Sequence, residues 1–349
     1  MATIKDVAKR AGVSISTVSN VINSSKYVSE ELKQRVNQAI AELNYRVDVT
    51  ARNMKTRTTK TIGVVVNSIG SIFIPQVMNG IQNYASKRGY QILFYASDFI
   101  FEKEKRCVSL LLDNKVDGII IDTVASYKEK SYFEYLANLK TGDKNVFVVS
   151  LERNLMRYGI YSVHVNNLLG GKMATEYLIE KGCRDIAVIS GPNSMDVIYD
   201  RLCGYKEALQ EAGLPYHADR IEFGDYTTLS GYLAMKRFIT NAVHFDGVFS
   251  CNDQMAIGAL KALKESGLEI PDAIKLIGFD NTYVSSIAVP ALTTINVPKF
   301  RMGVVAAQKL VDMIEGNLEE GECSYEIPVN LIKRMTTDAD SDNGIELEW

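Results

Sequence analysis

The chain has 349 residues, of which 46% are hydrophobic and 23% charged, and its formal net charge at pH 7 is −3. This composition is typical of a folded protein with sizeable cores, and the length predicts more than one domain. No apolar run is long enough to cross a bilayer, and no apolar signal segment opens the chain, which predicts a cytoplasmic protein. Five scattered cysteines and three histidines form no CxxC pair and no metal-ligand spacing, so neither a metal nor another cofactor is expected.

The start of the chain predicts three short helices in the pattern of a helix-turn-helix. Thr3 and Asp6 form a short capping box before the first helix, and Gly12 permits a sharp turn after it. Ser14 and Ser29 stand where the caps of the second and third helices belong, and apolar residues recur at helical spacing in all three. In this motif the N-terminal end of the second helix enters the major groove of DNA.

Charge is distributed unevenly along the chain. Residues 1–60 contain 11 Lys and Arg against 5 Asp and Glu, a formal charge of +6, so residues 61–349 carry −9 (−3 minus +6). A basic head on an acidic body favours contact with DNA phosphates through the head alone.

Beyond residue 61 the pattern alternates between short apolar runs and amphipathic stretches. The runs expected to form strands are 62–66, 91–96, 118–121, 146–150, 162–165, 186–190, 221–223, 247–250 and 275–278. The stretches expected to form helices are 76–88, 102–114, 128–139, 168–181, 201–212, 229–241 and 254–266. Such alternation predicts parallel sheets, and the span suits two of them. Ligands of these folds bind beyond the carboxyl ends of the strands, which predicts a site in a cleft between two lobes.

Motifs in the expected order along nearly the whole chain resemble the LacI/GalR family of transcriptional regulators. They are TIKDVAKRAGVSISTVSNVIN (3–23), VSE (28–30), ARNMKT (51–56), KTIG (60–63), VDGII (116–120), GGKMAT (170–175), RLCGY (201–205), NDQMAIG (252–258), IGFDN (277–281) and PALTTI (290–295).

The resemblance implies an all-α helix-turn-helix head joined to an α/β core of two doubly wound parallel-sheet lobes, like that of periplasmic binding proteins. We expect a head at 1–46, a hinge helix or linker at 47–60, a core at 61–337 and an acidic tail at 338–349. Within the core, the expected first lobe is about 61–160 plus 292–322, and the second about 161–291 plus 323–337. The implied partners are double-stranded operator DNA, a small effector and a second copy of the chain. The tail has no leucine heptads, so we expect a dimer rather than a tetramer.

In the head, Ile15, Ser16 and Asn20 are the candidates for base contact, through a thymine methyl, several bases and adenine respectively. Many family members have arginine at the position of Asn20, so their usual operator is not assumed here. Thr17 and Ser19 are expected nearer the phosphates. The full set expected to bind DNA is Thr3, Ser14, Ile15, Ser16, Thr17, Ser19, Asn20, Asn23, Tyr27, Arg52, Met54 and Lys55.

The last three of these belong to the hinge. Arg52 and Lys55 supply charge toward phosphate, and Met54 stands where the family places a leucine that wedges into the minor groove. So short and polar a segment is expected to become helical only on DNA.

The family resemblance also assigns an effector site to positions just after the core strands. The expected contacts are Asn67, Phe73, Asp98, Glu152, Arg201, Tyr226, Asn252, Asp253 and Asp280, with Asn67 and Asp98 the weaker candidates. Carboxylates and an arginine around an aromatic face suit hydroxyl-rich ligands, which favours a sugar or sugar derivative. A purine or an anionic metabolite is the alternative, because Arg201 could pair with either.

Two other classes of protein share parts of this pattern. A solute receptor has the same core, but the basic head and the lack of a signal segment argue against it. A nucleotide-dependent enzyme also alternates strands and helices, yet residues 67–73 are not GxGxxG, and neither a P-loop nor a Ser-His-Asp set is present. We therefore predict a non-enzymatic regulator, most consistent with a repressor, and the sequence leaves open whether the effector loosens or tightens DNA binding.

Overall fold

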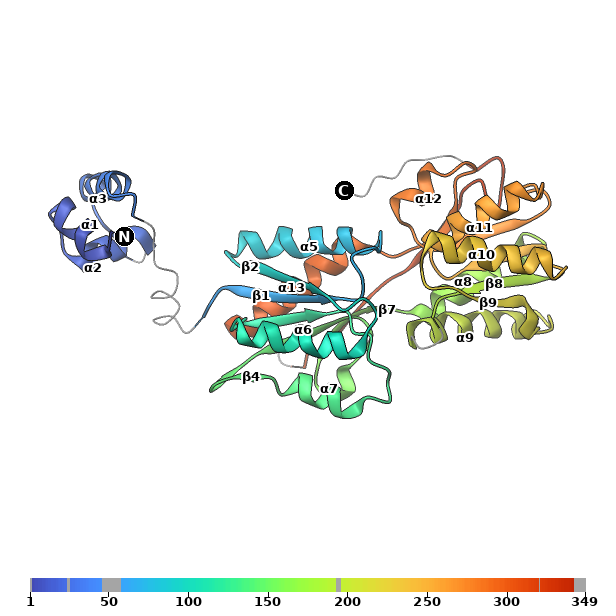
Figure 1. Cartoon of the computed structure of the whole chain (residues 1–349), viewed down its shortest axis with the longest axis horizontal. Coiled ribbons are helices and arrows are strands. Elements are labelled where there is room, and N and C mark those ends of the chain that lie inside the picture. Colours follow the sequence, from blue (N-terminus) through green and yellow to red (C-terminus); the bar gives the residue numbers. More distant parts are fainter. Residues whose placement is uncertain (1, 24–25, 46–57, 193–195, 320, 342–349) are drawn as a thin grey trace. The chain divides into compact units, whose positions relative to one another are not determined.

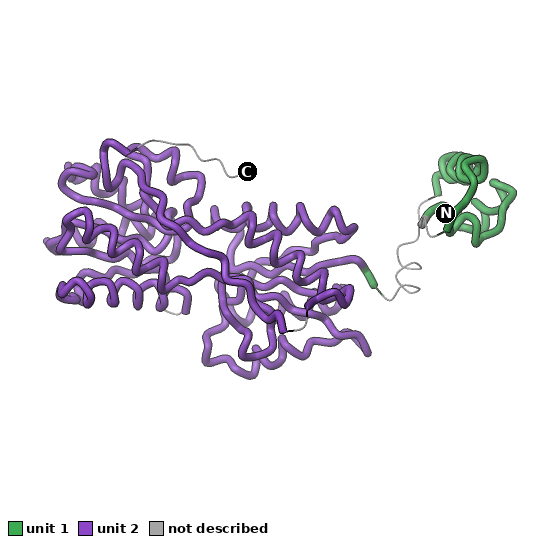
Figure 2. Tube along the Cα trace, turned by 180° about the vertical axis from the view of Figure 1, so that it is seen from behind, with its two compact units in different colours: residues 1–59 green, residues 60–349 purple. Residues whose placement is uncertain are grey.

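The computed structural model describes residues 2–23, 26–45, 58–192, 196–319 and 321–341, which form two compact units, Met1–Thr59 and Lys60–Trp349 (Figure 2). Residues 47–57 of the expected hinge (47–60) and residues 342–349 of the expected tail (338–349) lie outside the described residues. Among the residues described, no helix is long and apolar enough to span a membrane.

The first unit contains helices α1 (Ile4–Ala11), α2 (Ile15–Asn23) and α3 (Glu30–Glu42). Thr3 and Asp6 form the predicted capping box, and Gly12 adopts the left-handed conformation at φ 65°. Ser14 Oγ accepts a hydrogen bond from Thr17 N at 3.1 Å, as expected of a cap. The prediction for Ser29 was wrong in part, because it occupies the N-cap position of α3 without a capping side-chain hydrogen bond.

The helices of this unit share one small apolar core. Its buried members are Val7, Ala8, Ala11, Val18, Val36 and Ala39. The Arg35 guanidinium donates to the carbonyl oxygen of Ala11 at 2.7 Å and so ties α3 to the turn after α1. The turn between α1 and α2 is therefore fixed from both sides, which sets the direction of α2.

The first lobe of the second unit is a six-stranded parallel sheet in the order β13-β7-β6-β3-β1-β2 (Figure 1). The strands are β1 (Thr61–Val66), β2 (Gln91–Ala96), β3 (Gly118–Ile121), β6 (Phe147–Glu152), β7 (Tyr161–Val165) and β13 (Ser324–Ile327). Helices α5 (Ile74–Lys87) and α13 (Lys299–Glu315) cover one face, and α6 (Phe101–Asp113) and α7 (Lys130–Ala137) cover the other. Central strands are buried on both faces, which explains their uninterrupted apolar runs.

The second lobe is also a six-stranded sheet, in the order β14-β12-β11-β10-β8-β9. Its strands are β8 (Ile186–Ser190), β9 (Ile221–Phe223), β10 (Gly247–Ser250), β11 (Lys275–Asp280), β12 (Thr293–Asn296) and β14 (Asn330–Ile332). All neighbours pair in parallel except β12 and β14. Its helices are α8 (Asn167–Glu180), α9 (Asp196–Glu211), α10 (Thr228–Thr240), α11 (Asp253–Glu265) and α12 (Tyr283–Ile287). The smaller elements of the core are β4 (Lys140–Thr141), β5 (Lys144–Asn145), η1 (Met156–Tyr158) and η2 (Ala218–Arg220).

The chain passes between the lobes after β7, after β12 and after β13. The expected lobe boundaries at 160, 292 and 322 were therefore wrong by about one strand each. The strand β7 belongs to the first sheet, β12 to the second and β13 to the first, because each crossing follows its strand rather than preceding it. The sequence of a single strand does not say which of two sheets it joins, because its pairing partners lie elsewhere in the chain.

Candidate functional site

The N-terminal end of α2 presents the predicted DNA-reading side chains to solvent. Ser14, Ile15 and Ser16 are exposed, and the Ser14 hydroxyl lies 2.7 Å from that of Ser16 and 2.8 Å from that of Thr17. Ile15 is 45% exposed, an unusual state for an isoleucine, and it offers the apolar surface that a thymine methyl would contact.

The remaining predicted DNA contacts lie at four places in the chain. Ser19, Asn20 and Asn23 lie on α2, Thr3 caps α1, and Tyr27 is 94% exposed in the segment before α3. The hydroxyl of Thr3 already donates to Asp6 at 2.7 Å. Arg52, Met54 and Lys55 lie outside the described residues, so their roles remain predictions.

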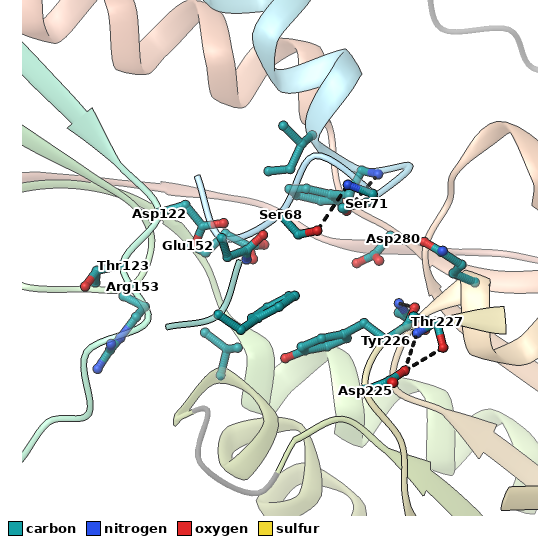
Figure 3. A pocket seen from close by; sticks show the side chains of 18 of the residues that line it. Ser68, Ser71, Asp122, Thr123, Glu152, Arg153, Asp225, Tyr226, Thr227 and Asp280 are labelled. Atoms are coloured by element: carbon teal, nitrogen blue, oxygen red, sulfur yellow. Dashed lines mark hydrogen bonds between the residues drawn. The ribbon is translucent and has the colours of Figure 1, made fainter. Parts of the chain in front are cut away.

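The core contains a cavity of about 110 Å³ at the carboxyl ends of both sheets (Figure 3). Seven of the nine predicted effector residues line it: Asn67, Phe73, Glu152, Arg201, Tyr226, Asn252 and Asp280. The first-lobe residues follow β1 and end β6, and the second-lobe residues follow β9 and β10 and end β11. The cavity therefore lies where the alternation of strands and helices predicts a ligand to bind.

Arg201 is held on α9 by a very close approach of α8. A Cβ on Gly171 would lie 2.2 Å from the Arg201 carbonyl oxygen, and one on Gly204 would lie 2.0 Å from that of Leu168, so only glycine fits at either place. The buried Arg201 guanidinium donates to Asn167 Oδ1 at 2.8 Å and to the Cys251 carbonyl oxygen, and it lies over the ring of Phe279. Its Nη1 is 3.7 Å from Asp280 Oδ1, which makes it the cation of the second-lobe wall.

Besides Asp225, whose carboxylate accepts from Thr227 N and Thr227 Oγ1, three carboxyl groups surround the cavity, from Asp122, Glu152 and Asp280. Burial raises the pKa of all three, and the neighbouring Glu152 carboxylate raises the pKa of Asp122 further. Arg201 opposes the increase for Glu152 and for Asp280. Asp122 Oδ2 and Glu152 Oε1 are buried and have no hydrogen-bond partner among the described residues.

Backbone strain gathers at the same place. Glu152, Tyr226 and Asp280 have φ values of 61°, 70° and 106°, and Phe99 has 58°, although none is glycine. Residues with side chains rarely adopt this region without support from their surroundings, and such residues cluster at ligand sites. The strain sets the direction of four side chains that line the cavity.

An aromatic pair crosses the cleft between the lobes. The rings of Phe99, after β2, and Tyr226, after β9, stack with centroids 5.6 Å apart and an interplanar angle of 21°. Figure 3 shows Tyr226 along the second-lobe side of the cavity, with Asp225 and Thr227 beside it. The pair gives the cavity one apolar wall, suited to the face of a ring.

Two predicted effector residues do not line the cavity. Asp253 is buried, and its carboxylate accepts from Thr282 N at 2.6 Å, from Thr282 Oγ1 at 2.9 Å and from Thr294 Oγ1 at 2.6 Å. It thus joins α11 to the loop after β11, and burial raises its pKa to about 6. Asp98 is exposed and pairs with Lys103, while its neighbour Phe99 reaches the cavity. The assignment of these two to the cavity wall was wrong.

Sequence reasoning missed other residues of the wall, namely Ser68, Ser71, Phe99, Asp122, Thr123, Arg153, Val197, Asp225, Thr227 and Gln254. Asp122 follows β3 directly, so its place after a strand was a signal that could have found it. Arg153 follows Glu152, and its guanidinium points away from the cavity centre (Figure 3). It donates to the Ala125 carbonyl oxygen and to Asp196 of α9, an ion pair that joins the two lobes.

Asp196 also accepts from the backbone N–H of Tyr127 at 3.0 Å, so a single second-lobe carboxylate holds two groups of the first lobe. These contacts keep the lobes together around the cavity. In the part of the chain that is described, no group of His, Cys, Asp and Glu side chains is arranged to hold a metal ion.

A head with an exposed reading helix and a two-lobed core with a buried polar cavity define a DNA-binding regulator. The family model for bacterial regulatory proteins of the lacI family matches residues 3–48, and the one for periplasmic binding protein-like domains matches residues 175–337. The chain is 35% identical over 334 residues to the HTH-type transcriptional repressor PurR of Histophilus somni (strain 129Pt), covering 96% of this chain and 98% of that one. It is 34% identical over 339 residues to the HTH-type transcriptional regulator RegA of Clostridium saccharobutylicum, covering 97% and 100%.

Solved structures of transcriptional regulators are also similar to this chain. The Lac repressor dimer bound to operator and the anti-inducer ONPF has a TM-score of 0.86 at 29% identity, covering 96% of this chain and 99% of that one. The complex of the transcriptional regulator CelR with cellobiose has a TM-score of 0.70 at 31% identity, covering 96% and 100%. The chain belongs to the lacI family of bacterial regulatory proteins and is a transcriptional regulator of the helix-turn-helix type.

Proposed function

We propose that the protein is a repressor whose homodimer binds a near-palindromic operator, and that a small effector in the core cavity controls the affinity. The observation that carries the proposal is the cavity itself, where buried unpartnered carboxylate oxygens and strained residues of both lobes meet. A ligand that joins the two lobes biases their arrangement and hence the DNA affinity.

The effector that the cavity favours is a sugar or sugar derivative. Buried carboxylate oxygens accept hydrogen bonds from hydroxyl groups, Arg201 and Asn252 donate, and the stacked rings cover an apolar ring face. The complex of the relative CelR with cellobiose supports this class. Four acidic residues of the wall against one available arginine disfavour an anionic metabolite.

A purine is the second candidate. The stack of Phe99 and Tyr226 supplies a flat apolar wall for an aromatic base, and the cavity carboxylates could accept from its N–H groups. The names of several relatives, PurR, agree with this alternative.

An exposed apolar surface on the second lobe supports the dimer. Tyr283, Ile287 and Val289, on and just after α12, are 54%, 61% and 76% exposed. Contiguous exposed apolar residues of this kind are typical of protein interfaces. In a two-fold symmetric dimer the two heads would match the symmetry of a palindromic operator. We propose action in the cytoplasm, where the operator lies, and no catalytic activity.

The test is selection of duplexes from a random pool by the full chain, followed by titration of the selected operator. We expect a near-palindromic sequence, an affinity that falls steeply with salt, and loss of binding when residues 1–59 are deleted. Undiminished operator affinity in the truncated protein would contradict the proposal.

A hinge variant tests the DNA side of the proposal. Met54→Ala should weaken binding to the selected operator more than binding to random DNA, because a wedge is productive only at a deformable step. Equal losses on both would mean that Met54 acts only as linker.

A further inference from the structure

The cavity holds more negative than positive charge. Asp122, Glu152, Asp225 and Asp280 contribute carboxyl groups, of which Asp225 already accepts from Thr227, and Arg201 is the guanidinium that faces the other three. Arg153 also borders the cavity, but its guanidinium points away and is occupied by Asp196 and the Ala125 carbonyl oxygen (Figure 3).

Two of the carboxyl groups lie on one wall without a cation of their own. Asp122 and Glu152 lie side by side at the ends of neighbouring strands β3 and β6 (Figure 3). Asp122 is only 3% exposed, and its Oδ2, like Glu152 Oε1, is buried with no hydrogen-bond partner among the described residues. Among the described residues, neither Asp122 nor Glu152 forms an ion pair. The nearest carboxylate partner of Arg201 Nη1 is Asp280.

The rigid support behind Asp122 keeps this arrangement in place. The buried Glu104 accepts from Thr123 Oγ1 and from Val124 N, each at 2.6 Å, and so fixes the segment that follows β3. Asp122 itself donates its backbone N–H to Val65 at 2.9 Å. The backbone that carries Asp122 is thus held in place, and a ligand in the cavity can reach the unpartnered oxygens of both carboxyl groups.

We infer, resting on the effector site proposed above, that the natural effector carries an ammonium group which donates to both Asp122 and Glu152. The class of ligand is an amino sugar or a similarly aminated polyol ring. Its ammonium group lies at the first-lobe wall, its hydroxyl groups face Arg201 and Asn252, and one ring face lies toward Phe99 and Tyr226.

A neutral ligand satisfies this wall less well than a cation. Hydroxyl groups can donate to the carboxyl oxygens, but they supply no positive charge to offset the burial that raises the pKa of Asp122 and of Glu152. An ammonium group supplies three donors together with the opposite charge, and charge-assisted hydrogen bonds are about twice as strong as neutral ones. An anion adds repulsion and is excluded.

The experiment compares matched ligands on the full-length protein by calorimetry. The probes are glucose, galactose and mannose, each with its 2-amino and its 2-N-acetylamino analogue, so that within each set only the substituent at C2 differs and only the amine is charged. We expect at least one amino sugar to bind roughly tenfold or more tightly than both of its neutral counterparts.

Variants locate the preference. Asp122→Asn and Glu152→Gln should each reduce the preference for the amine to within about threefold of the neutral sugar. Asp113→Asn and Glu134→Gln make the same changes on the exposed faces of α6 and α7 and should leave the preference unchanged. Thermal melting of each variant establishes that it is folded, and either cavity variant alone suffices for the test.

Three results would overturn the inference: a neutral sugar that binds as tightly as its amine, an amine preference that survives both cavity substitutions, or no binding of any amino sugar in the panel. The proposed function fails separately. A neutral sugar or a purine that binds the cavity and changes operator affinity keeps the proposed function while overturning the ammonium group. An amino sugar that binds the cavity with the expected preference but leaves operator affinity unchanged supports the ammonium group and overturns the proposed function.

Discussion

The two walls of the cavity come from equivalent ends of two similar sheets, but their polar groups are in different states. On the second-lobe wall, Arg201 is bonded to Asn167 and to the Cys251 carbonyl oxygen, and Asn252 caps α11 through Met255 N at 2.8 Å. On the first-lobe wall, Asp122 and Glu152 keep buried carboxylate oxygens without partners among the described residues.

The difference separates two tasks. The second-lobe wall is organised before a ligand arrives, so it positions the ligand at little cost in reordering. The first-lobe wall has polar groups that only a ligand can satisfy, and the gain on binding is largest there. Substitutions on the two walls should therefore have opposite effects on the unliganded protein.

The largest effect is expected for Arg201→Ala. Removal of the buried guanidinium leaves Asp280 without its cation, and losing one partner of a buried pair costs about 3–5 kcal/mol. We expect the free energy of unfolding to fall by that order in urea titrations, and the effector response to be lost. Arg184→Ala, an exposed arginine of the same lobe, is the control and should change neither.

A pH experiment tests the buried carboxyl group of Asp253, which lies outside the cavity and joins α11 to Thr282 and Thr294. Burial raises its folded-state pKa from 3.8 to about 6, so the folded protein binds this proton more tightly than the unfolded chain does. The resulting stabilisation is complete below the unfolded pKa and is lost as the pH rises through the folded pKa. Over about two pKa units this amounts to about 3 kcal/mol.

Asp253→Asn removes that titration. The difference in unfolding free energy between the wild type and the variant should therefore shift by about 3 kcal/mol between roughly pH 4 and pH 7. Asp113→Asn, at an exposed site, should give a difference that stays constant. A constant difference for Asp253→Asn would show that its carboxyl group titrates normally.

On the first-lobe wall, Asp122→Asn should stabilise the unliganded protein. It removes the repulsion from Glu152 and the burial of an unpartnered carboxylate, worth about 1 kcal/mol, or a rise in Tm of about 2 °C for a core of this size. Differential scanning calorimetry without ligand is the measurement. A lower Tm would mean that Asp122 is already satisfied and that the two walls are alike.

The smallest effect is expected for Phe99→Ala. Loss of the stack with Tyr226 removes about 1 kcal/mol of aromatic contact, so the effector should bind roughly fivefold more weakly while the unliganded fold is kept. Phe94→Ala, on β2 and outside the cavity, is the matched control. Equal losses for the two would remove Phe99 from the site.

Local chemistry made much of the fold predictable. The capping box of Thr3 and Asp6 and the apolar runs of β2, β3 and β8 follow from interactions close in sequence. The helix α13 and the exchange of β12 and β13 between the lobes were not predicted, since only long-range packing determines which sheet receives a strand.

The cavity wall shows the same limit. Asp253 and Asp280 both stand next to a core strand, and only the fold turns the first toward Thr282 and Thr294 and the second toward Arg201. The neighbours Asp98 and Phe99 both have the left-handed backbone conformation. With this backbone the ring of Phe99 lines the cavity and the carboxylate of Asp98 does not. Conformations of this kind depend on the surrounding structure rather than on the residue type.

The central claim is that the cavity governs operator binding by the head, and operator titration tests it most directly. The dissociation constant of the selected operator would be measured for the full-length wild type and for Arg201→Ala, with and without the ligand that calorimetry identifies. We expect that ligand to change the wild-type constant roughly fivefold or more in either direction, and to leave the constant of the variant unchanged. No change in the wild type, or an equal change in both proteins, would contradict the account.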